Sequence, residues 1–497
     1  TLNALINEYL VFYTKKGKYI LLKNCPSLKI GKLSVNKKGF GFVILPEEDD
    51  IYIDKTNLKD AISDDIVLCE VTSKGDRPEG KIVKIIKRDL KNVVGEVYVK
   101  QHKMYLKLDD SSKDISVLLN PDTTHNCVEG HKVLVEITER LKNHLYLGDV
   151  LKIIGHKNDP QVDILSIAYK YGIYEDFNPR VIEELDDIPD EVDSSELKNR
   201  RDLTDKVIFT IDGDDTKDID DAISLEKDGD NYVLGVHIAD VSNYVKENTA
   251  LGDEAYNRGT SSYLADTVIP MLPHKLSNGI CSLNEGVIRL SMSCVMTYNP
   301  EGQLVSYDIF PSYLKSRKKM TYKNVNKIIM ENTIPDGYED FADTLKEMHK
   351  LAKILRKAKE RRGYIDFDLD EVKIIQDEKG CAIDIEKRVR GEGEKLIEDF
   401  MIAANECVAS HIYNMDLPFI YRIHEVPKPE KIEEFMTMVK ILGYRIRTNT
   451  KEITPRTMQS ILSELKDKKE FAILSEMLLR SMRKAEYSNE NLGHFGI

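Results

Sequence analysis

The chain contains 497 residues, of which 41% are hydrophobic and 32% are charged, and its formal net charge is −13. This length exceeds what one hydrophobic core holds, so several domains are expected. No apolar run approaches the ~20 residues that a membrane-spanning helix needs. No signal-peptide pattern opens the sequence.

The seven cysteines lie far apart and form no CxxC pair. This pattern indicates reduced thiols and a cytoplasmic location. Charge is unevenly distributed, because the first forty residues hold eight lysines against one acid, Glu8, whereas residues 175–196 are strongly acidic. A basic start is typical of phosphate contacts, although a solvated lysine-rich face is the alternative. The eight residues are Lys15, Lys16, Lys18, Lys23, Lys29, Lys32, Lys37 and Lys38.

Residues 1–27 are too short for a domain and are interpreted as the remnant of a longer N-terminal region. Residues 28–90 and 91–156 each contain short β-rich runs separated by Gly, Asp and Pro turn signals. IVLCEVT followed by EGKIVKII in the first block matches KVLVEIT followed by LGDVLKII in the second. This repeat predicts two copies of a small five-stranded barrel of the OB or cold-shock type.

Two aromatic residues in the first block, Phe40 and Phe42, alternate with glycines beside Lys37 and Lys38. A period of two places both rings on one face of a strand. Exposed rings next to lysines form a stacking platform for single-stranded bases. The alternative is that both rings fill the barrel interior.

Residues 157–205 are interpreted as a connector, and residues 206–497 as a mixed α/β domain. Asp228-Gly229 predicts the turn of a β-hairpin between two alternating runs. Helices are expected over 338–362, ending at Gly363, over 394–414, and over 429–442, following Pro429 and ending at Gly443.

The segment TIDGDDTKDIDDA places six aspartates within ten residues, from Asp212 to Asp221. Such a dense acidic set beside apolar residues is unfavourable unless a cation or solvent offsets it. Oxygen ligands suit Mg²⁺ or Mn²⁺, and a pair of metals ~4 Å apart activates water and neutralises the leaving oxygen in phosphodiester hydrolysis. A calcium loop of EF-hand type needs Gly at its sixth position and Glu at its twelfth. Counted from Asp212, these positions hold Lys217 and Ile223, which excludes such a loop. An acidic surface turn remains the alternative.

With GVHIADVS and VIPMLPHKLSNGICSLNE downstream, this segment resembles the catalytic domain of the ribonuclease II/ribonuclease R (RNB) family. The form of the motif and the paired barrels resemble the ribonuclease R branch more closely, and the similarity covers about residues 28–497. It implies two cold-shock domains, a mixed α/β (α+β) RNB catalytic domain, and Mg²⁺-dependent hydrolysis of single-stranded RNA from a free 3′ end, with processive release of nucleoside 5′-monophosphates.

The resemblance places the four active-site aspartates of the family on Asp212, Asp218, Asp220 and Asp221. Asp212, Asp218 and Asp221 are assigned as ligands of Mg²⁺. Two Mg²⁺ ions are expected, and Mn²⁺ is expected to substitute for them. Asp220 is assigned to the catalytic step, where it orients the water or a second metal. Asp214 and Asp215 fall outside the set and are expected to face solvent.

Further substrate contacts are carried over with their structural alternatives open. Tyr263 matches a tyrosine that packs against the terminal base, and Tyr322 matches one in the substrate channel, although either could be filler. Glu398 shares a helix face with Ile402 and Asn405 and is expected near the sugar 2′-hydroxyl, unless it is a buried Glu paired with a nearby Arg or Lys. Arg422 is a candidate phosphate contact. The histidines His237 and His424 are interpreted as structural, because neither has a partner at metal-ligand spacing.

The chain ends at NLGHFGI, where the family continues into a segment with an essential phosphate-contacting arginine and a C-terminal OB-type domain. The polypeptide is therefore expected to keep the metal site but to lose much of its rate and RNA affinity. The competing hypotheses are a noncatalytic RNA-binding protein with a decayed nuclease domain and a metal-dependent DNA nuclease. A monomer is expected.

Overall fold

The computed structural model of the chain describes residues 11–13, 19–21, 25, 27–36, 38–45, 48–59, 61–73, 78–88, 91–110, 113, 115–124, 126–142, 145–264, 267–365, 371–377, 380–388, 390–447 and 453–496. Lys15, Lys16, Lys18, Lys23 and Lys37 lie outside these ranges. The chain forms two compact units, the first reaching to Glu175 and including Tyr263–Ile269 and Gln376–Ala382, and the second formed by the rest.

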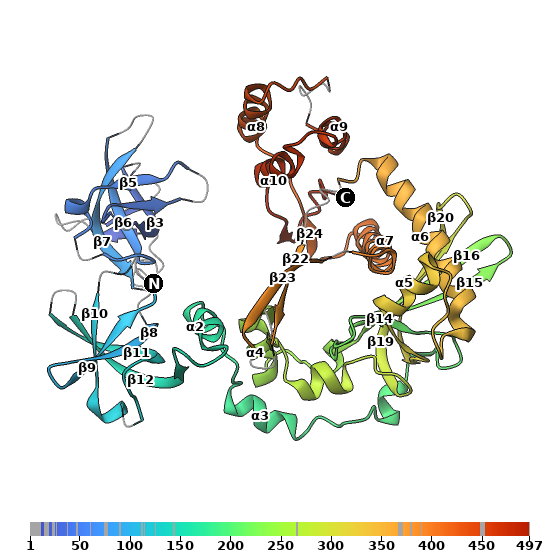
Figure 1. Ribbon diagram of the computed structural model, residues 1–497, viewed down its shortest axis with the longest axis horizontal. Coiled ribbons are helices and arrows are strands. Elements are labelled where there is room, and N and C mark those ends of the chain that lie inside the picture. Colours follow the sequence, from blue (N-terminus) through green and yellow to red (C-terminus); the bar gives the residue numbers. More distant parts are fainter. Residues whose placement is uncertain are drawn as a thin grey trace. The chain divides into compact units, whose positions relative to one another are not determined.

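The first unit contains a closed five-stranded barrel (Figure 1). Alternation along each strand turns small and branched residues such as Leu33, Val43 and Ile53 inward, where they are fully buried. The strands are β3 (Leu28–Val35), β4 (Gly41–Ile44), β5 (Ile51–Ile53), β6 (Ile66–Ser73) and β7 (Glu79–Lys87).

A second closed barrel follows with the same strand order as the first. In both barrels the third strand pairs in parallel with the fifth, and every other pair is antiparallel. The duplicated module predicted from the repeat is therefore confirmed. Its strands are β8 (Asn92–Lys100), β9 (Lys103–Leu108), β10 (Ser116–Leu119), β11 (His131–Lys142) and β12 (Leu145–His156).

The segment interpreted as a connector contains helices. Helix α2 (Val162–Lys170) packs against the second barrel, where Tyr169 lies with Val94 and Leu134. The side chain of Asn178 caps the N-terminus of helix α3 (Pro179–Leu185), and Pro179 is its first residue, a position that favours proline. A short strand, β13 (Arg201–Asp202), then joins the main sheet of the second unit.

The second unit is built on a five-stranded sheet of order β13-β20-β19-β16-β15. The predicted hairpin is confirmed, since β15 (Asp221–Asp228) and β16 (Asn231–Ala239) are antiparallel and Gly229 has φ 57°. The remaining strands are β19 (Ile288–Tyr298) and β20 (Leu304–Lys315).

Three helices pack with this sheet around the largest core, which contains Phe209, Leu234, Leu345 and Phe400. Helix α6 begins at Ala342, later than predicted, because a separate turn precedes it, and it ends at Gly363 with φ 112°. The helices are α5 (Tyr322–Met330), α6 (Ala342–Arg362) and α7 (Glu392–Asn414).

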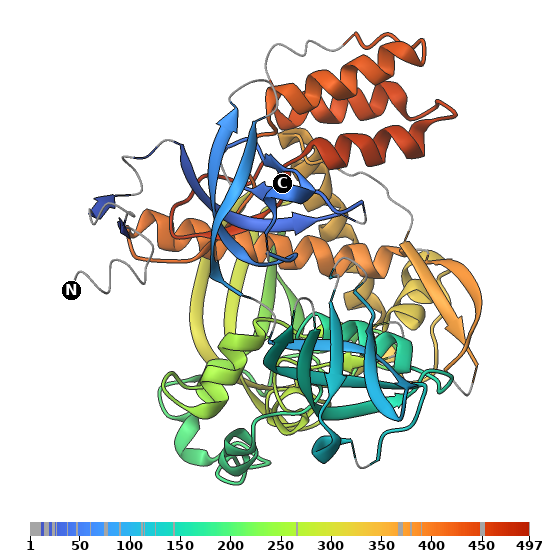
Figure 2. The ribbon, with the colours of Figure 1, turned by 90° about the vertical axis from the view of Figure 1, so that its left-hand side faces the viewer.

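Three further helices form a separate group with its own core around Phe435 and Leu474 (Figure 2). They are α8 (Pro429–Ile441), α9 (Pro455–Leu465) and α10 (Phe471–Ser481). Smaller elements are α4 (Ala250–Arg258) and the pairs β1 (Val11–Tyr13) with β2 (Tyr19–Leu21), β14 (Thr210–Asp212) with β21 (Lys319–Thr321), β17 (Ser262–Tyr263) with β18 (Val268–Ile269), β22 (Glu371–Gln376) with β23 (Ala382–Arg388), and β24 (Tyr421–Ile423) with β25 (Glu486–Ser488).

The predicted fold class, two small barrels followed by a mixed α/β domain, is confirmed by this architecture. A search of the described helices finds none with the length and apolar character needed to cross a bilayer.

Candidate active site

The Asp-rich segment runs from the end of one strand to the start of another. Thr210 and Ile211 are buried in β14, which carries Asp212 to its exposed end, opposite Thr321 of β21. The loop then returns to β15, where Asp221 pairs with Ile238 in the register of the sheet. The strand pairs therefore place Asp212 and Asp221 at two fixed positions with a short loop between them.

Ile219 anchors that loop because it is fully buried between the predicted functional aspartates. Asp212, Asp218 and Asp221 are partly buried, and Asp220 is more exposed than these three. Asp214 and Asp215 are exposed, as predicted. An acidic surface turn therefore describes only part of the segment.

The carboxylates interact electrostatically. Burial raises the pKa of Asp212, and the charge of Asp218 raises it further. Asp220 is exposed as a whole residue, but its carboxyl group lies among other protein atoms, so burial also raises its pKa, with added repulsion from Asp218 and Asp212. The pKa of Asp221 is raised to about 6, first by burial and then by the charges of Asp212 and Asp220. A cation would relieve this repulsion.

The donor chemistry of these four aspartates fits a hard divalent cation, which prefers oxygen ligands. Within the described ranges, however, no three acidic, His or Cys side chains are already gathered as a metal-holding group. The four carboxylates are thus brought to one loop and its flanking strand ends without forming a closed coordination shell.

Several contacts from distant residues hold the backbone of the loop. The ammonium group of Lys319 donates to the carbonyl of Thr216 at 2.5 Å, and the Ser282 hydroxyl donates to that of Lys217 at 2.8 Å. The Ala239 amide donates to the Asp220 carbonyl at 2.9 Å. No sequence pattern indicated that Lys319 or Ser282 contacts this loop, although Ser282 lies within the stretch VIPMLPHKLSNGICSLNE.

Two predicted tyrosines occupy different settings. Tyr322 is the first residue of α5 and directly follows Thr321, which pairs with Asp212 across the two strands. Tyr263 lies in the β17–β18 hairpin with 68% of its surface exposed, as a stacking role requires. Their contacts with a substrate stay predictions.

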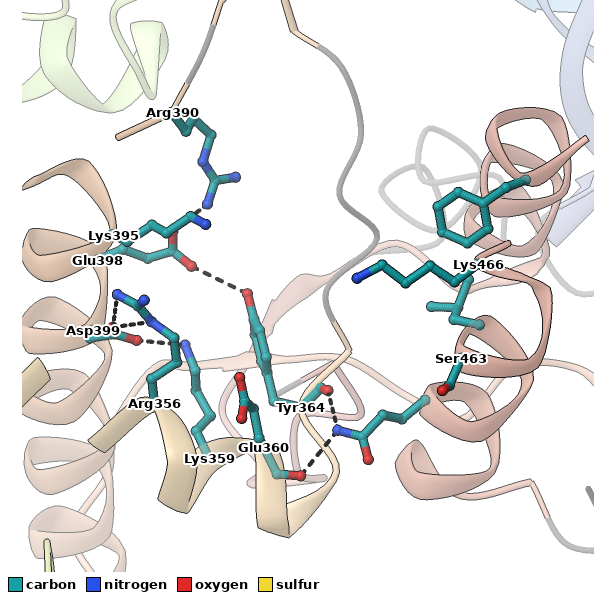
Figure 3. Close-up of a pocket in the computed structure, with 13 residues that line it drawn as sticks. Arg356, Lys359, Glu360, Tyr364, Arg390, Lys395, Glu398, Asp399, Ser463 and Lys466 are labelled. Carbon is teal, nitrogen blue, oxygen red and sulfur yellow. Dashed lines mark hydrogen bonds and ion pairs between the residues drawn. The ribbon is translucent and has the colours of Figure 1, made fainter. Parts of the chain in front are cut away.

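Glu398 and Asp399 line a cavity of about 550 Å³ between α6, α7 and the three-helix group (Figure 3). Glu398 is partly buried, pairs with Arg390 at 2.7 Å and accepts a hydrogen bond from the Tyr364 hydroxyl at 3.3 Å. The structural alternative, a Glu paired with a nearby Arg, is thus present, and the predicted sugar contact stays a prediction.

Asp399, the next residue, is 5% exposed and forms ion pairs with two cationic side chains. Lys359 Nζ lies 3.1 Å and Arg356 Nη2 lies 2.9 Å from its carboxylate oxygens. Figure 3 shows these cations beside Asp399, with Lys466 reaching into the cavity from the opposite wall. No sequence pattern indicated this buried group.

Arg422 lies on β24, exposed, with its guanidinium 4.8 Å from the centroid of the Tyr487 ring. It lines a second cavity, of about 730 Å³, together with Ile402 and Asn405. The polar stripe predicted on α7 therefore reaches two cavities, with Glu398 in one and Asn405 in the other.

His237 is structural, as predicted. It is 2% exposed, and its ring nitrogens lie 2.7 Å from the Ser293 hydroxyl and 3.1 Å from the Ser224 hydroxyl. Burial lowers its pKa to about 4, so the ring is neutral near physiological pH.

The rings of Phe40 and Phe42 lie outside the first barrel rather than in its core. Phe42 is 37% exposed. Tyr52, which no sequence pattern indicated, completes an aromatic trio, its ring centroid 5.4 Å from that of Phe40 and 5.7 Å from that of Phe42. Lys38 is exposed next to them, and Lys37 lies outside the described residues. The base-stacking role stays a prediction.

Three family models match successive parts of the chain. They describe the OB domain of ribonuclease B over residues 31–85, the cold shock domain over 105–178, and the RNB domain over 200–497.

Relatives extend over nearly the whole chain. Ribonuclease R of Thermotoga maritima is 42% identical over 98% of the chain, which covers 69% of that protein. Ribonuclease R 1 of Lactococcus lactis is 39% identical over 100% of the chain, which covers 63% of that protein.

Solved structures match as well. Mycoplasma genitalium RNase R in complex with ribose-methylated single-stranded RNA superposes with a TM-score of 0.88 at 29% identity, over 94% of this chain and 75% of that one. Yeast Ssd1, a pseudonuclease, shares the fold with a TM-score of 0.70 at 17% identity, over 96% of this chain and 66% of that one.

Proposed function

The chain belongs to the RNB family, in its ribonuclease R branch, and from this premise we propose that it hydrolyses single-stranded RNA from the 3′ end and releases nucleoside 5′-monophosphates. The observation that carries the proposal is the electrostatically coupled set Asp212, Asp220 and Asp221, held with Asp218 in the loop between β14 and β15 and at its flanking strand ends. An acidic set of this kind suits Mg²⁺ and a phosphodiester substrate.

Each aspartate has a role in the proposal. Asp212, Asp218 and Asp221 hold Mg²⁺, with Mn²⁺ as a substitute. Bound Mg²⁺ would stabilise negative charge on the scissile phosphate and the leaving 3′-oxygen. Asp220, the most exposed of the four, reaches solvent and orients the attacking water or a second metal ion.

The substrate assignment rests on stacking groups and charge. Phe40, Phe42 and Tyr52 form a platform beside Lys38, which suits unpaired bases and phosphates. The cavity of Glu398 is lined by five cationic side chains against three acidic ones, which suits a polyanion. The M. genitalium RNase R structure holds single-stranded RNA, consistent with the same ligand class here.

The finer contacts are also part of the proposal. Tyr263 packs against the terminal base, Tyr322 lines the substrate channel, Glu398 contacts the sugar, and Arg422 binds a phosphate. Recognition of the 2′-hydroxyl would restrict the enzyme to RNA. We further expect a monomer that acts in the cytoplasm, to be checked by light scattering and by imaging of a tagged chain.

The test compares 5′-labelled and uniformly labelled RNA with DNA of the same sequence, with and without Mg²⁺. Wild-type protein is expected to shorten only RNA, to release mononucleotides, and to stop in EDTA. Asp220→Asn is expected to lose this activity. Asp214→Asn is the matched control, because Asp214 lies exposed in the same loop outside the assigned set. Equal rates for Asp220→Asn and wild type would contradict the assignment of Asp220.

A noncatalytic RNA-binding protein is the second candidate, because the same fold occurs in the pseudonuclease Ssd1 and fold alone does not decide chemistry. RNA binding without product formation in the assay would favour it. Degradation of the DNA would instead favour a DNA nuclease.

A further inference from the structure

Ser282 lies behind the Asp loop although it is 63 residues from Ile219 in the sequence. It is 1% exposed. Its hydroxyl accepts a hydrogen bond from the Ile219 amide at 3.1 Å and donates one to the Lys217 carbonyl at 2.8 Å. A weaker acceptor, Asn284 Oδ1, lies 3.4 Å away, so the single hydroxyl hydrogen favours the loop carbonyl.

These two bonds bracket Asp218. The Lys217 carbonyl belongs to the peptide unit before Asp218, and the Ile219 amide belongs to the peptide unit after it. One oxygen atom therefore restrains the planes on both sides of Asp218, and with them its two backbone dihedral angles. We propose that Ser282 is a positioning residue that sets the direction of the Asp218 side chain.

Ser282 can do this because it is itself held firmly. The guanidinium of Arg289, 7% exposed, donates from Nε to the Ser282 carbonyl at 3.0 Å and from Nη1 to the Ile288 carbonyl at 3.0 Å. The Leu283 amide, next in the chain, donates to the Ile219 carbonyl at 2.9 Å. Ile219 is thus bonded through its amide and its carbonyl to two consecutive residues.

Precise placement of Asp218 matters because its charge acts on two other members of the set, Asp212 and Asp220. Groups that orient metal ligands typically change metal affinity or activity by about 10–100-fold when removed. The inference rests on the proposed role of Asp218 as a cation ligand, but the backbone restraint does not.

The first experiment measures hydrogen exchange of the metal-free full chain over residues 213–222. Ser282→Ala is expected to exchange the Ile219 amide faster than wild type. The matched control is Ser293→Ala, since Ser293 is equally buried and its hydroxyl binds His237 and Ser312 instead of the loop. Ser293→Ala is expected to leave exchange in the loop unchanged.

The second experiment titrates Mn²⁺ calorimetrically, and RNA digestion is followed for kcat and KM. Ser282→Ala is expected to weaken Mn²⁺ binding by about 10–100-fold and to lower kcat with KM for RNA unchanged. Ser282→Thr, which keeps the hydroxyl, is expected to recover part of the loss. Ser293→Ala is expected to bind Mn²⁺ as wild type does, even if it melts at a lower temperature.

Unchanged loop exchange and Mn²⁺ affinity in Ser282→Ala would overturn the inference while leaving the nuclease proposal intact. If wild type does not degrade RNA but Ser282→Ala exchanges faster and binds Mn²⁺ more weakly, the nuclease proposal fails and the positioning role stands. If Ser282→Ala does not fold, Ser282→Cys provides the test, because a thiol of similar size makes weaker hydrogen bonds. Wild-type loop exchange and Mn²⁺ affinity in a folded Ser282→Cys would overturn the inference.

Discussion

Asp212 and Thr321 are paired as the last residues of two parallel strands, β14 and β21. Thr321 is also the cap of α5, accepting a hydrogen bond from the Asn324 amide at 3.3 Å. At this end of the strand pair, β14 therefore carries the carboxylate of Asp212, and β21 leads directly into a helix whose first residue is Tyr322. A predicted cation ligand and a predicted substrate contact share one rigid support.

The first prediction concerns removal of the cation. Mg²⁺ or Mn²⁺ should raise the melting temperature of wild type, with a stabilisation of about 2.7 kcal/mol at 100 times the dissociation constant. Asp212→Asn should lose most of this shift because an assigned ligand is gone. In EDTA, Asp212→Asn should be at least as stable as wild type, since one repelling charge is removed. Thermal unfolding with cation and with EDTA gives both numbers, and an equal cation shift in the two proteins would contradict the assignment.

The second prediction concerns pH. Burial lowers the pKa of His237 to about 4, whereas the unfolded ring titrates near 6.5, so the unfolded state binds more protons between these values. Stability contributed by the neutral ring is complete above pH 6.5 and is lost as pH falls towards 4. Replacement by Gln should flatten this dependence by up to about 3 kcal/mol. Urea unfolding from pH 7 to pH 4 measures it, and parallel curves for variant and wild type would refute it.

The third prediction concerns the aromatic trio of the first barrel. Phe42→Ala and Tyr52→Ala should each weaken binding of single-stranded RNA in EDTA, because a stacked base is worth about 1–3 kcal/mol. Ile44→Ala is the control, since Ile44 is 40% exposed on the same face of β4 but carries no ring. Fluorescence anisotropy with a labelled oligonucleotide gives the affinities. Equal losses for Ile44→Ala and Phe42→Ala would argue against stacking.

The fourth prediction concerns Glu398. Glu398→Gln keeps the size of the side chain but removes the charge that faces Arg390 and Tyr364. The preference for RNA over an oligonucleotide with 2′-deoxy residues at its 3′ end should fall by about 10-fold or more, as for loss of a hydrogen bond to a charged group. Glu394→Gln, one turn earlier on α7, serves as the control. An unchanged preference in Glu398→Gln would remove Glu398 from sugar recognition.

The fifth prediction concerns the buried ion pairs of Asp399. Asp399→Asn leaves Lys359 and Arg356 without their shared counter-charge inside the protein, which should cost about 3–5 kcal/mol. Glu406→Gln, two turns later on α7, breaks an exposed pair with Arg362 and should cost less than about 1 kcal/mol. Urea unfolding compares them. A cost for Asp399→Asn no larger than for Glu406→Gln would show that the buried pair contributes little.

Structural features that depend on residues close together in the sequence could be predicted. Alternation in 28–156 gave the barrels, and glycine or proline at Gly363 and Pro429 marked helix ends. The Asp segment was recognisable because its members are neighbours in the chain. The family comparisons add the identity of the domains, but the roles of the individual aspartates stay predictions.

Contacts between distant segments could not be predicted. Ser282 and Lys319 reach the Asp loop from separate elements, and although Ser282 lies within a recognised stretch, nothing in that stretch indicates which of its residues contacts the loop. Tyr52 joins Phe40 and Phe42 only because β4 and β5 are adjacent in the first barrel. Whether Glu398 is paired depended on the fold around α7, which brings Tyr364 to it as well as Arg390.

Closure of the two barrels has a consequence for how their strands can meet other molecules. Every barrel strand has two hydrogen-bonded neighbours, so neither barrel offers an open edge for pairing with another molecule. Strand addition to either barrel is therefore not available as a route of association. The outer face of β4 can accordingly display an aromatic ring such as Phe42 without the aggregation risk that an open edge strand would bring.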